Sequence, residues 1–277
     1  MKLTILLVVL NNKDFINQAI DNFLAQACSE AELLIMDGAS TDGTLSVIQE
    51  YATRFPSIRF VSEKDSGQSD AMNKGLKLAK GEFVSFLNVD DFYSEGIFNK
   101  VVSFLNNDSS IDFITGNCHV WDEKGALIYI NRPTPIEKHH VLSGFHFPVN
   151  PTAYFYRKSI HDTVGYYNEK NHYNMDLEFI VQAVLHFKIT YVNCDWGNFR
   201  MLPNTKTFSD QLSNQLEDRK RALLKRYLKD ESIFVKFKVR LYKIDKVYTP
   251  RILSVYRKIR DKIGYEFSKF NTKNRFK

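Results

Sequence analysis

The sequence has few cysteines, few helix-breaking residues and no long apolar run. Its three cysteines, Cys28, Cys118 and Cys194, are odd in number, stand far apart and form no CxxC pair. Neither a disulfide framework nor a zinc cluster built from them is expected, and a reducing cytoplasm fits best. Glycine and proline together make up only 19 of 277 residues, which excludes collagen-like repeats and wholesale disorder. No run of about 18 apolar residues occurs, so no membrane-spanning helix is expected.

Two nucleotide-binding signatures are also missing. No GxGxxG follows the first apolar run, which disfavours a nicotinamide-dependent dehydrogenase. A nucleotidyltransferase would share an α/β sheet and carboxylate-bound Mg²⁺. It normally needs a glycine-rich loop that grips phosphate, and the sequence has none.

Positive charge is concentrated toward the C-terminal end. Residues 219–277 carry 20 basic and 5 acidic residues, a net charge of +15, whereas residues 1–218 carry a net charge of −9. This asymmetry indicates a polyanionic partner for the tail, either an anionic membrane or nucleic acid. A protein that binds nucleic acid through the tail is an alternative, but we do not expect a nucleic-acid partner, because the acidic body would repel phosphates and no nucleic-acid-binding motif occurs. A solvated, lysine-rich helical face is the plainer alternative.

The first half of the chain alternates strand and helix patterns. The apolar run at 3–10 passes directly into polar residues without a cleavage site, so it predicts a buried strand rather than a signal peptide. Further strands are predicted at 32–37, 58–62 and 82–87, and helices at 14–27, at 69–79 and after a cap within Ser40–Asp42. This alternation predicts a mostly parallel sheet with helices on both faces.

The pattern becomes less regular after residue 105. Strands are predicted at 112–116, 125–131 and 188–192, a helix at 176–187, and a proline-rich loop at 131–152 that is typical of substrate-covering segments. We therefore divide the chain into a body, residues 1–207 with halves 1–105 and 106–207, and a helical tail, residues 208–277.

Three apolar stripes at helical spacing are predicted in the tail. The stripes comprise Leu212, Leu216, Leu223 and Tyr227; then Ile233, Phe237, Leu241 and Ile244; then Ile252, Tyr256, Ile259, Ile263 and Phe267. Basic residues flank the last stripe, namely Arg251, Arg257, Lys258, Arg260 and Lys262, and a basic amphipathic helix of this kind can lie on an anionic bilayer. Packing of the stripes on the body or on a second copy of the chain is the alternative, and the sequence leaves a homodimer open.

Polar residues stand at the carboxyl ends of the predicted strands, where ligands bind in such sheets. Asn11 follows the first strand, Asp37 ends the second, and Asn88–Asp91 follow the fourth. Hard divalent cations, Mn²⁺ or Mg²⁺, take oxygen ligands and bridge substrate phosphates. Because the adjacent side chains of Asp90 and Asp91 diverge on an extended segment, we expect one to bind metal and the other to be structural. A turn or helix cap is the alternative.

Four motifs occur in order at these positions: VVLNN at 8–12, DGASTDGT at 37–44, AMNKG at 71–75 and FLNVDDFY at 86–93. Together they resemble glycosyltransferase family 2, the inverting GT-A enzymes that use nucleotide-sugars. The resemblance covers roughly residues 3–200, and the run from 63 to 93 looks like bacterial enzymes that build surface polysaccharides. It implies a Rossmann-like α/β fold with a donor half and an acceptor half, to which this chain adds its basic helical tail.

The resemblance also implies roles for the donor side. Asn11 matches the approach to the nucleotide, and Asp37 matches the acid that hydrogen-bonds the base, usually uracil. Asp70 and Asn73 match the segment that lines the nucleotide and sugar. A carboxylate suits the N3–H donor of uracil.

The run Asn88-Val89-Asp90 stands at the family's DxD position. The resemblance implies that Asp90 ligates the metal that bridges the diphosphate and that Asn88 faces the ribose or the sugar. Asn88 departs from the usual first aspartate, since it keeps an oxygen but loses the charge. A catalytically inactive sugar-nucleotide-binding relative is therefore an alternative.

A catalytic base is expected near residue 176. Asn174-Met175-Asp176-Leu177-Glu178 resembles the family segment in which a carboxylate at a helix start deprotonates the acceptor. Asp176 is the first candidate and Glu178 the second, and the alternative for Asp176 is a helix N-cap. The sequence thus predicts a cytoplasmic, membrane-peripheral, metal-dependent enzyme that moves a hexose or N-acetylhexosamine, from a UDP-sugar, onto a glycan or lipid-linked acceptor.

Overall fold

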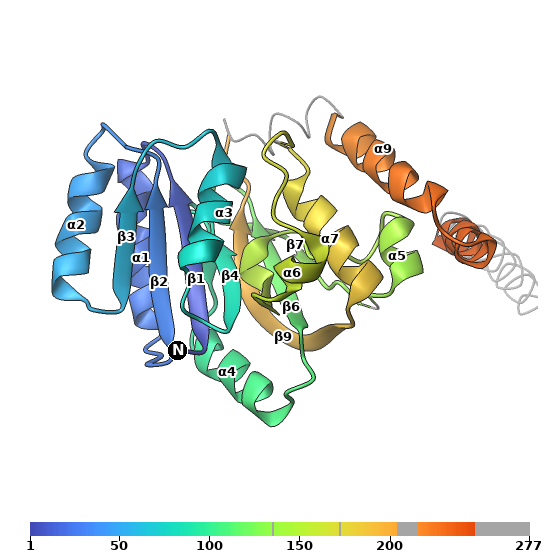
Figure 1. The fold of residues 1–277 in the computed structure, drawn as a ribbon, viewed down its shortest axis with the longest axis horizontal. Coiled ribbons are helices and arrows are strands. Elements are labelled where there is room, and N and C mark those ends of the chain that lie inside the picture. Colours follow the sequence, from blue (N-terminus) through green and yellow to red (C-terminus); the bar gives the residue numbers. More distant parts are fainter. Residues whose placement is uncertain (135, 172, 204–214, 247–277) are drawn as a thin grey trace, which may run out of the picture.

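A nine-stranded β-sheet organises the residues that the computed structural model describes, which are 1–134, 136–171, 173–203 and 215–246 (Figure 1). Its order is β3-β2-β1-β4-β8-β6-β9-β5, with β7 paired to β6. Helices cover both faces, as the alternating pattern predicted.

The first four strands are parallel, and all four were predicted. They are β1 (Leu3–Val9), β2 (Ala31–Asp37), β3 (Ile58–Ser62) and β4 (Phe83–Leu87), connected by helices α1 (Lys13–Ala25), α2 (Thr44–Arg54) and α3 (Gln68–Leu78). β1, β2 and β4 are buried almost throughout, which explains their unbroken apolar sequences. Their carboxyl ends therefore share one edge of the sheet.

The second half extends the same sheet. Its strands are β5 (Phe92–Tyr93), β6 (Phe113–Trp121), β7 (Leu127–Asn131), β8 (Tyr154–Arg157) and β9 (Ile189–Arg200). β8 is antiparallel to both β4 and β6, and β9 is parallel to β6. β6 and β9 thus run in the same direction as β4, so Arg200 ends β9 at the edge where Asn88 follows β4. The predictions stopped both strands too early, at 116 and 192.

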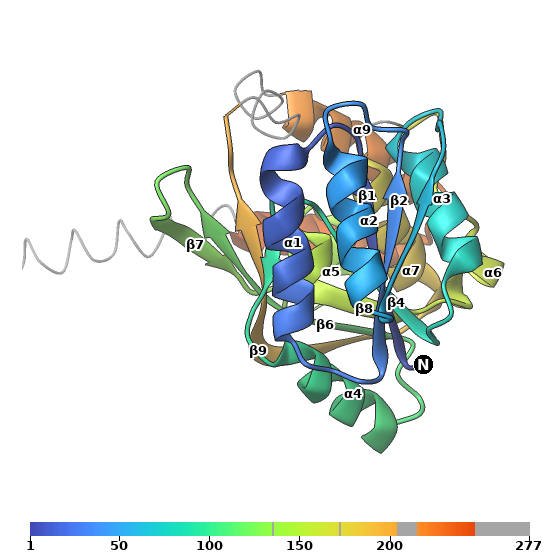
Figure 2. The same cartoon turned by 90° about the vertical axis from the view of Figure 1, so that its left-hand side faces the viewer.

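Several elements were not predicted from the sequence. They are β5, β8 and the helices α4 (Ile97–Asn107) and α6 (Ile160–Val164). The expected loop at 131–152 contains helix α5 (Lys138–Leu142). The 3-10 turn η1 (Pro151–Ala153) begins near the end of the expected loop. The hairpin of β6 and β7 projects from the body (Figure 2).

Two apolar layers fix the helices to the sheet. One layer joins β1 to α1, α2 and α4, and it contains Ile5, Leu7, Ile20, Ile48 and Phe98. The other joins the opposite face to α3 and to α7 (Met175–His186), and it contains Leu6, Met72, Phe113 and Phe179. Alternate residues of β1 serve opposite layers, as the two-residue period of a strand requires.

Helix α9 (Gln215–Lys229) packs on the body beside α5 and α7 (Figure 1). Leu223 and Leu224 are buried, and the hydroxyl of Tyr227 accepts a hydrogen bond of 2.8 Å from Gln182 of α7. For Tyr227 in the first predicted stripe, packing on the body is therefore the correct alternative. Leu212 lies outside the described residues.

A second tail helix, residues 233–246, follows α9. The predicted stripe on this helix is exposed, with exposed fractions of 86% at Ile233 and 57% at Phe237. On its other side Val239 is buried against the body. The third predicted stripe lies outside the described residues. Within the described part of the chain, no helix is long and apolar enough to cross a membrane.

Candidate functional site

Asp37 is a buried acid at the carboxyl end of β2. Its Oδ2 accepts a 2.6 Å hydrogen bond from the hydroxyl of Ser62, at the end of β3, and a 3.2 Å bond from the backbone N–H of Ser40. An ionised carboxylate has about four acceptor positions, so these two donors leave others open. Asp37 is therefore held rigidly and can still accept from a ligand.

The loop after β1 is tied to the loop after β2. The backbone N–H of Asn11 donates to the Ser40 hydroxyl at 2.8 Å, and the side-chain oxygen of Asn11 accepts from the N–H of Thr41, also at 2.8 Å. Asn11 has a φ of 50°, a left-handed conformation that asparagine tolerates better than most residues. The structure thus places Asn11 and Asp37 at the same end of the sheet, joined through Ser40.

Helix α2 begins later than the sequence suggested. The predicted cap lay within Ser40–Asp42, but Gly43 stands at the N-cap position with a φ of 99°. Asp42 acts from outside the helix, since its carboxylate accepts from the N–H and hydroxyl of Thr44 and from the N–H of Lys13. This carboxylate holds together the starts of α1 and α2 beside Asn11.

Asp91 is the buried, structural member of the pair after β4. Its carboxylate accepts from the side-chain amides of Asn88 at 2.8 Å and Asn150 at 2.7 Å, and from the backbone N–H of Arg200 at 3.0 Å. Burial and the neighbouring Asp90 raise its pKa to about 7, although these three donors favour the charged form. Asp91 therefore joins three segments from distant parts of the chain.

Asp90 differs from its neighbour because its carboxylate accepts no hydrogen bond from another of the described residues. The side chain is half-buried, and burial raises the pKa of Asp90, partly offset by the positive charge of Arg200. A carboxylate at a strand end that lacks donors suits a hard divalent cation, which prefers oxygen ligands. The residue chemistry therefore fits the metal that the sequence led us to expect.

Arg200 is a residue of this edge that the sequence analysis missed. Its Nε donates to the backbone carbonyl of Asp90, and its guanidinium also donates to Gln18 of α1 at 3.2 Å. The guanidinium carbon lies 5.4 Å from the centre of the Phe92 ring. The strand-end rule would have pointed to Arg200 if the full length of β9 had been predicted.

Asp176 faces a small pocket at the same end of the sheet. The pocket is lined by Val8, Gln68, Met72, Phe86, Leu87, Asn88, Pro151 and Asp176. Asp176 is the second residue of α7 and Asn174 takes the N-cap position, so the N-cap alternative for Asp176 is wrong. No described residue donates a hydrogen bond to the Asp176 carboxylate, and burial raises its pKa to about 6.

Glu178 projects away from this pocket. Two residues apart on a helix are about 200° apart around its axis, so Asp176 and Glu178 serve different faces. The Glu178 carboxylate accepts from Asn171 at 2.7 Å, from Tyr227 at 3.1 Å and from the guanidinium of Arg226. Its contacts join α7 to α9, and the structure gives no support to Glu178 as the second candidate base.

Asp70 and Asn73 lie on α3, and their side chains are bonded within the protein. The carboxylate of Asp70 accepts from the Ser66 N–H at 2.9 Å and pairs with Lys74 at 3.3 Å. The Ser66 bond and Lys74 lower the pKa of Asp70. The amide of buried Asn73 donates to the carbonyl of Tyr167 and accepts from its N–H, both at 2.9 Å. Asn73 thus positions the segment leading to α7 and has little left for a ligand.

Three known proteins are similar to this chain in sequence or in fold. The chain is 26% identical over 186 residues to a PGL/p-HBAD biosynthesis glycosyltransferase of Mycobacterium bovis, which covers 65% of this chain and 68% of that protein. S. aureus TarS 1-349 in complex with UDP-GlcNAc matches with a TM-score of 0.68 and 16% identity, over 90% of this chain and 73% of TarS. Mannosyltransferase PcManGT from Pyrobaculum calidifontis in complex with GDP-Man and Mn²⁺ matches with a TM-score of 0.64 and 16% identity, over 91% and 72%.

These likenesses confirm the predicted α/β GT-A fold. The chain spans only 18% of the length of GlyA of Streptococcus pneumoniae and 28% of EpsJ of Bacillus subtilis, glycosyltransferases to which it is 24% and 30% identical. The family model of glycosyl transferase family 2 matches residues 4–164, which is more than half of the chain. The protein belongs to glycosyl transferase family 2.

Proposed function

We propose that this glycosyltransferase moves a hexose or N-acetylhexosamine from a UDP-sugar onto an acceptor hydroxyl with inversion, and that Asp176 is its general base. The observation that carries the proposal is the Asp176 carboxylate, which accepts no hydrogen bond from the described residues and lines a pocket with Asn88 at the strand ends. A general base needs an open lone pair and a pKa near the working pH, and burial raises that of Asp176 to about 6.

The reaction requires one proton transfer and one exchange of bonds. Asp176 takes the proton of the acceptor hydroxyl as its oxygen attacks the anomeric carbon. The bond from that carbon to the diphosphate oxygen breaks, and the electron pair leaves with the nucleoside diphosphate. Attack from the face opposite the leaving group inverts the anomeric centre.

The nucleotide is assigned to the carboxyl ends of β1 and β2. Asp37 would accept the N3–H of uracil, in a setting fixed by Ser40 and Ser62, and the Asn11 loop would flank it. The UDP-GlcNAc complex of the neighbouring TarS fold supports a uridine nucleotide, whereas the GDP-Man complex of PcManGT supports a guanosine one. We favour uridine because the acceptor at residue 37 suits its N3–H.

Negative charge develops on the departing diphosphate and needs a compensating charge. Asp90 is the residue that would hold Mn²⁺ or Mg²⁺ there, and such an ion supplies Lewis-acid stabilisation when bound. Arg200 adds a fixed positive charge beside Asp90. The Mn²⁺ of the PcManGT complex supports a divalent ion, without fixing which one serves this chain.

The first test of the donor site is calorimetric titration of the full chain with UDP in the presence of Mn²⁺. Asp37→Asn is expected to weaken UDP binding at least tenfold, because the amide places a donor where the base needs an acceptor and a lost buried hydrogen bond costs about 1–3 kcal/mol. Asp162→Asn, an exposed change on α6, is the control and should bind as wild type does. Tighter binding of GDP than of UDP would contradict the uridine assignment.

We also propose that the second tail helix docks the enzyme on the anionic inner face of the cell membrane, where a lipid-linked glycan acceptor for polysaccharide synthesis would lie. Five large apolar side chains are exposed on it: Ile233, Phe234, Phe237, Leu241 and Ile244. The same helix carries Lys236, Lys238, Arg240, Lys243 and Lys246. Each basic residue near an anionic surface contributes about 1 kcal/mol, in addition to the burial of apolar groups.

Binding to vesicles of phosphatidylglycerol and phosphatidylcholine tests this surface. Replacing both Phe234 and Phe237 with serine is expected to lower vesicle binding at least tenfold, since each buried aromatic ring contributes about 1.5–3 kcal/mol. Phe104→Ser, on the exposed side of α4, is the matched control. Equal binding by all variants, or binding that does not fall with salt, would contradict the proposal.

A further inference from the structure

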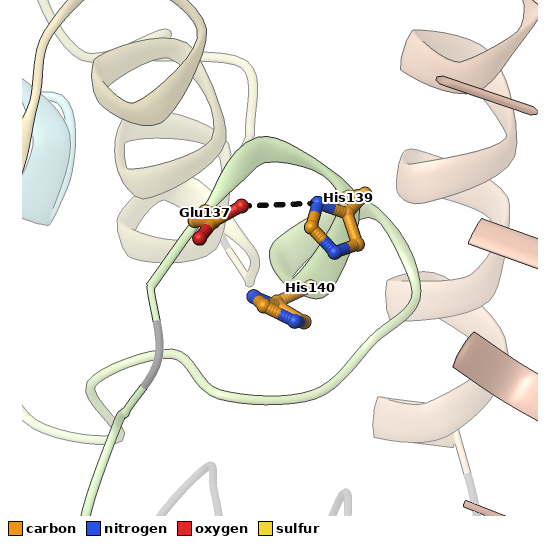
Figure 3. Close-up of side chains that lie close together, drawn as sticks. All are labelled: Glu137, His139 and His140. Carbon is orange, nitrogen blue, oxygen red and sulfur yellow. Dashed lines mark ion pairs between the residues drawn. The ribbon is translucent and has the colours of Figure 1, made fainter. Parts of the chain in front are cut away.

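Three side chains of residue types that bind metals in other proteins converge at the start of α5, and none of them is among the residues assigned above. Glu137, His139 and His140 each offer one ligand atom, and these atoms all lie within 4.8 Å of one another (Figure 3). The cluster comes from four consecutive residues, in which Glu137 is the extended N-cap and the two histidines are the second and third residues of the helix. The turn into α5 therefore brings the three side chains to one place.

His140 is the unusual member of the cluster. The residue is 6% exposed, and its buried Nδ1 has no hydrogen-bond partner among the described residues. Buried polar atoms are nearly always paired, because an unpaired one loses its hydrogen bonds to water without replacement. A bound cation would satisfy such a nitrogen.

The spacing within the cluster suits a tetrahedral ion. The Oε2 of Glu137 lies 3.4 Å from the Nδ1 of His139. Two ligands at about 2.0–2.1 Å from a tetrahedral zinc ion are about 3.3 Å apart, so these atoms are already at the required separation. The rings of His139 and His140 lie with their centres 3.9 Å apart, and the ligand atom of His140 lies within 4.8 Å of the other two.

We propose that Glu137, His139 and His140 form a binding site for a borderline transition-metal ion, with Zn²⁺ the best fit. Imidazole nitrogen is a ligand for zinc and its neighbours in the first transition series, whereas Mg²⁺ and Ca²⁺ prefer sites made of oxygen. Three protein ligands leave the fourth position for water. The site is distinct from the donor-side position of Asp90 in both ligands and preferred metal.

The surroundings indicate what this metal does. The Tyr242 ring of the second tail helix covers the cluster, with its centre 4.5 Å from that of His140, and its hydroxyl contacts the ring of His146. Lys138 of α5 also pairs with Glu231, in the link between the tail helices, at 3.1 Å. A metal that fixes the two histidine rings would therefore stabilise the surface on which the tail is seated.

Titration of the full chain with Zn²⁺ tests the proposal, on protein without a histidine tag and freed of metal with a chelator. Wild type is expected to bind one Zn²⁺, and Glu137→Gln and His139→Asn are each expected to weaken that binding at least tenfold. Both side chains are partly exposed, at 62% and 20%, so these variants should fold, as circular dichroism would verify. His186→Asn, an exposed histidine at the end of α7, is the matched control.

Four outcomes would overturn the site. Absence of Zn²⁺ binding to wild type, or equal affinity in Glu137→Gln and His139→Asn, would reduce the cluster to an ordinary ion pair. Mg²⁺ competing as well as Zn²⁺ would refute the metal class. Loss of Zn²⁺ binding in Asp90→Asn, but not in His139→Asn, would place the ion at the donor side. Zn²⁺ binding that is retained in Asp90→Asn and lost in His139→Asn supports the new site, and it does so even if the proposed role of Asp90 fails.

Discussion

Asp176→Asn is expected to lower turnover by about 10²–10⁴-fold, the usual contribution of a positioned general base. The amide keeps the size of the side chain but cannot take a proton. The affinity for UDP should stay unchanged, because the Asp176 carboxylate accepts no hydrogen bond from the described residues and its loss leaves no partner unpaired. Steady-state transfer rates together with UDP titration separate the two effects.

Glu178→Gln is the matched control, since it makes the same change two residues away on the same helix. Glu178 bonds to Asn171, Tyr227 and Arg226, so its replacement should lower the melting temperature and leave turnover within a few-fold of wild type. If Glu178→Gln lost turnover and Asp176→Asn kept it, the assignment of the base would be reversed.

The pH profile is a second readout of the Asp176 replacement. A base acts when deprotonated, so wild-type kcat/KM should fall as the pH drops through about 6, the raised pKa of Asp176. The pocket lining contains no other titratable side chain, and burial keeps the nearby tyrosines Tyr154, Tyr156 and Tyr167 neutral by raising their pKa values. The part of the acid limb near pH 6 should be lost from the residual activity of Asp176→Asn, whereas protonation of Asp91, whose pKa is about 7, lowers the activity of both proteins at acid pH.

The donor half could be predicted because its signals are local. A buried parallel strand requires a continuous apolar run, and a polar residue directly after it stands at the ligand edge by topology alone. Asn11 and Asp37 follow from that rule without any knowledge of side-chain contacts. The same rule placed Asp90 and Asp91 at this edge, and the divergence of adjacent side chains on an extended segment predicted that one would be structural and the other open.

The acceptor half was harder to predict from the sequence, because the positions of its strands and site residues depend on contacts between distant segments. The run of β9 after Val192 contains Asn193, Asp195 and Asn198, so its composition does not indicate a buried strand, and Arg200 was missed with it. The motif ranked Asp176 before Glu178, but only the packing of α9 through Arg226 shows that the Glu178 carboxylate is bonded within the protein. Asn73 resembles a ligand by motif, yet its partner Tyr167 is 94 residues away.

Asp90→Asn is expected to remove the dependence of UDP binding on Mn²⁺ and to lower turnover by two or more orders of magnitude. Binding of a divalent ion at this position depends on carboxylate charge, and an amide keeps the shape of the side chain without that charge. UDP titrations of wild type and variant, each with and without Mn²⁺, measure the effect directly. In wild type, affinity should rise with Mn²⁺, and in the variant the two titrations should coincide.

Asp91→Asn, at the adjacent position, is the most informative comparison. Asp91 accepts from Asn88, Asn150 and the Arg200 N–H, so an amide there replaces one acceptor oxygen with a donor that faces these donors. A buried polar group left unpaired costs about 1–3 kcal/mol of the free energy of unfolding, so we expect Asp91→Asn to lower the melting temperature. Asp90→Asn should melt at the same temperature as wild type. If Mn²⁺ still strengthened UDP binding to Asp90→Asn, the ion would have other ligands, and the role of Asp90 would have to be abandoned. If Asp91→Asn alone lost the metal effect without losing stability, the two carboxylates would have exchanged roles.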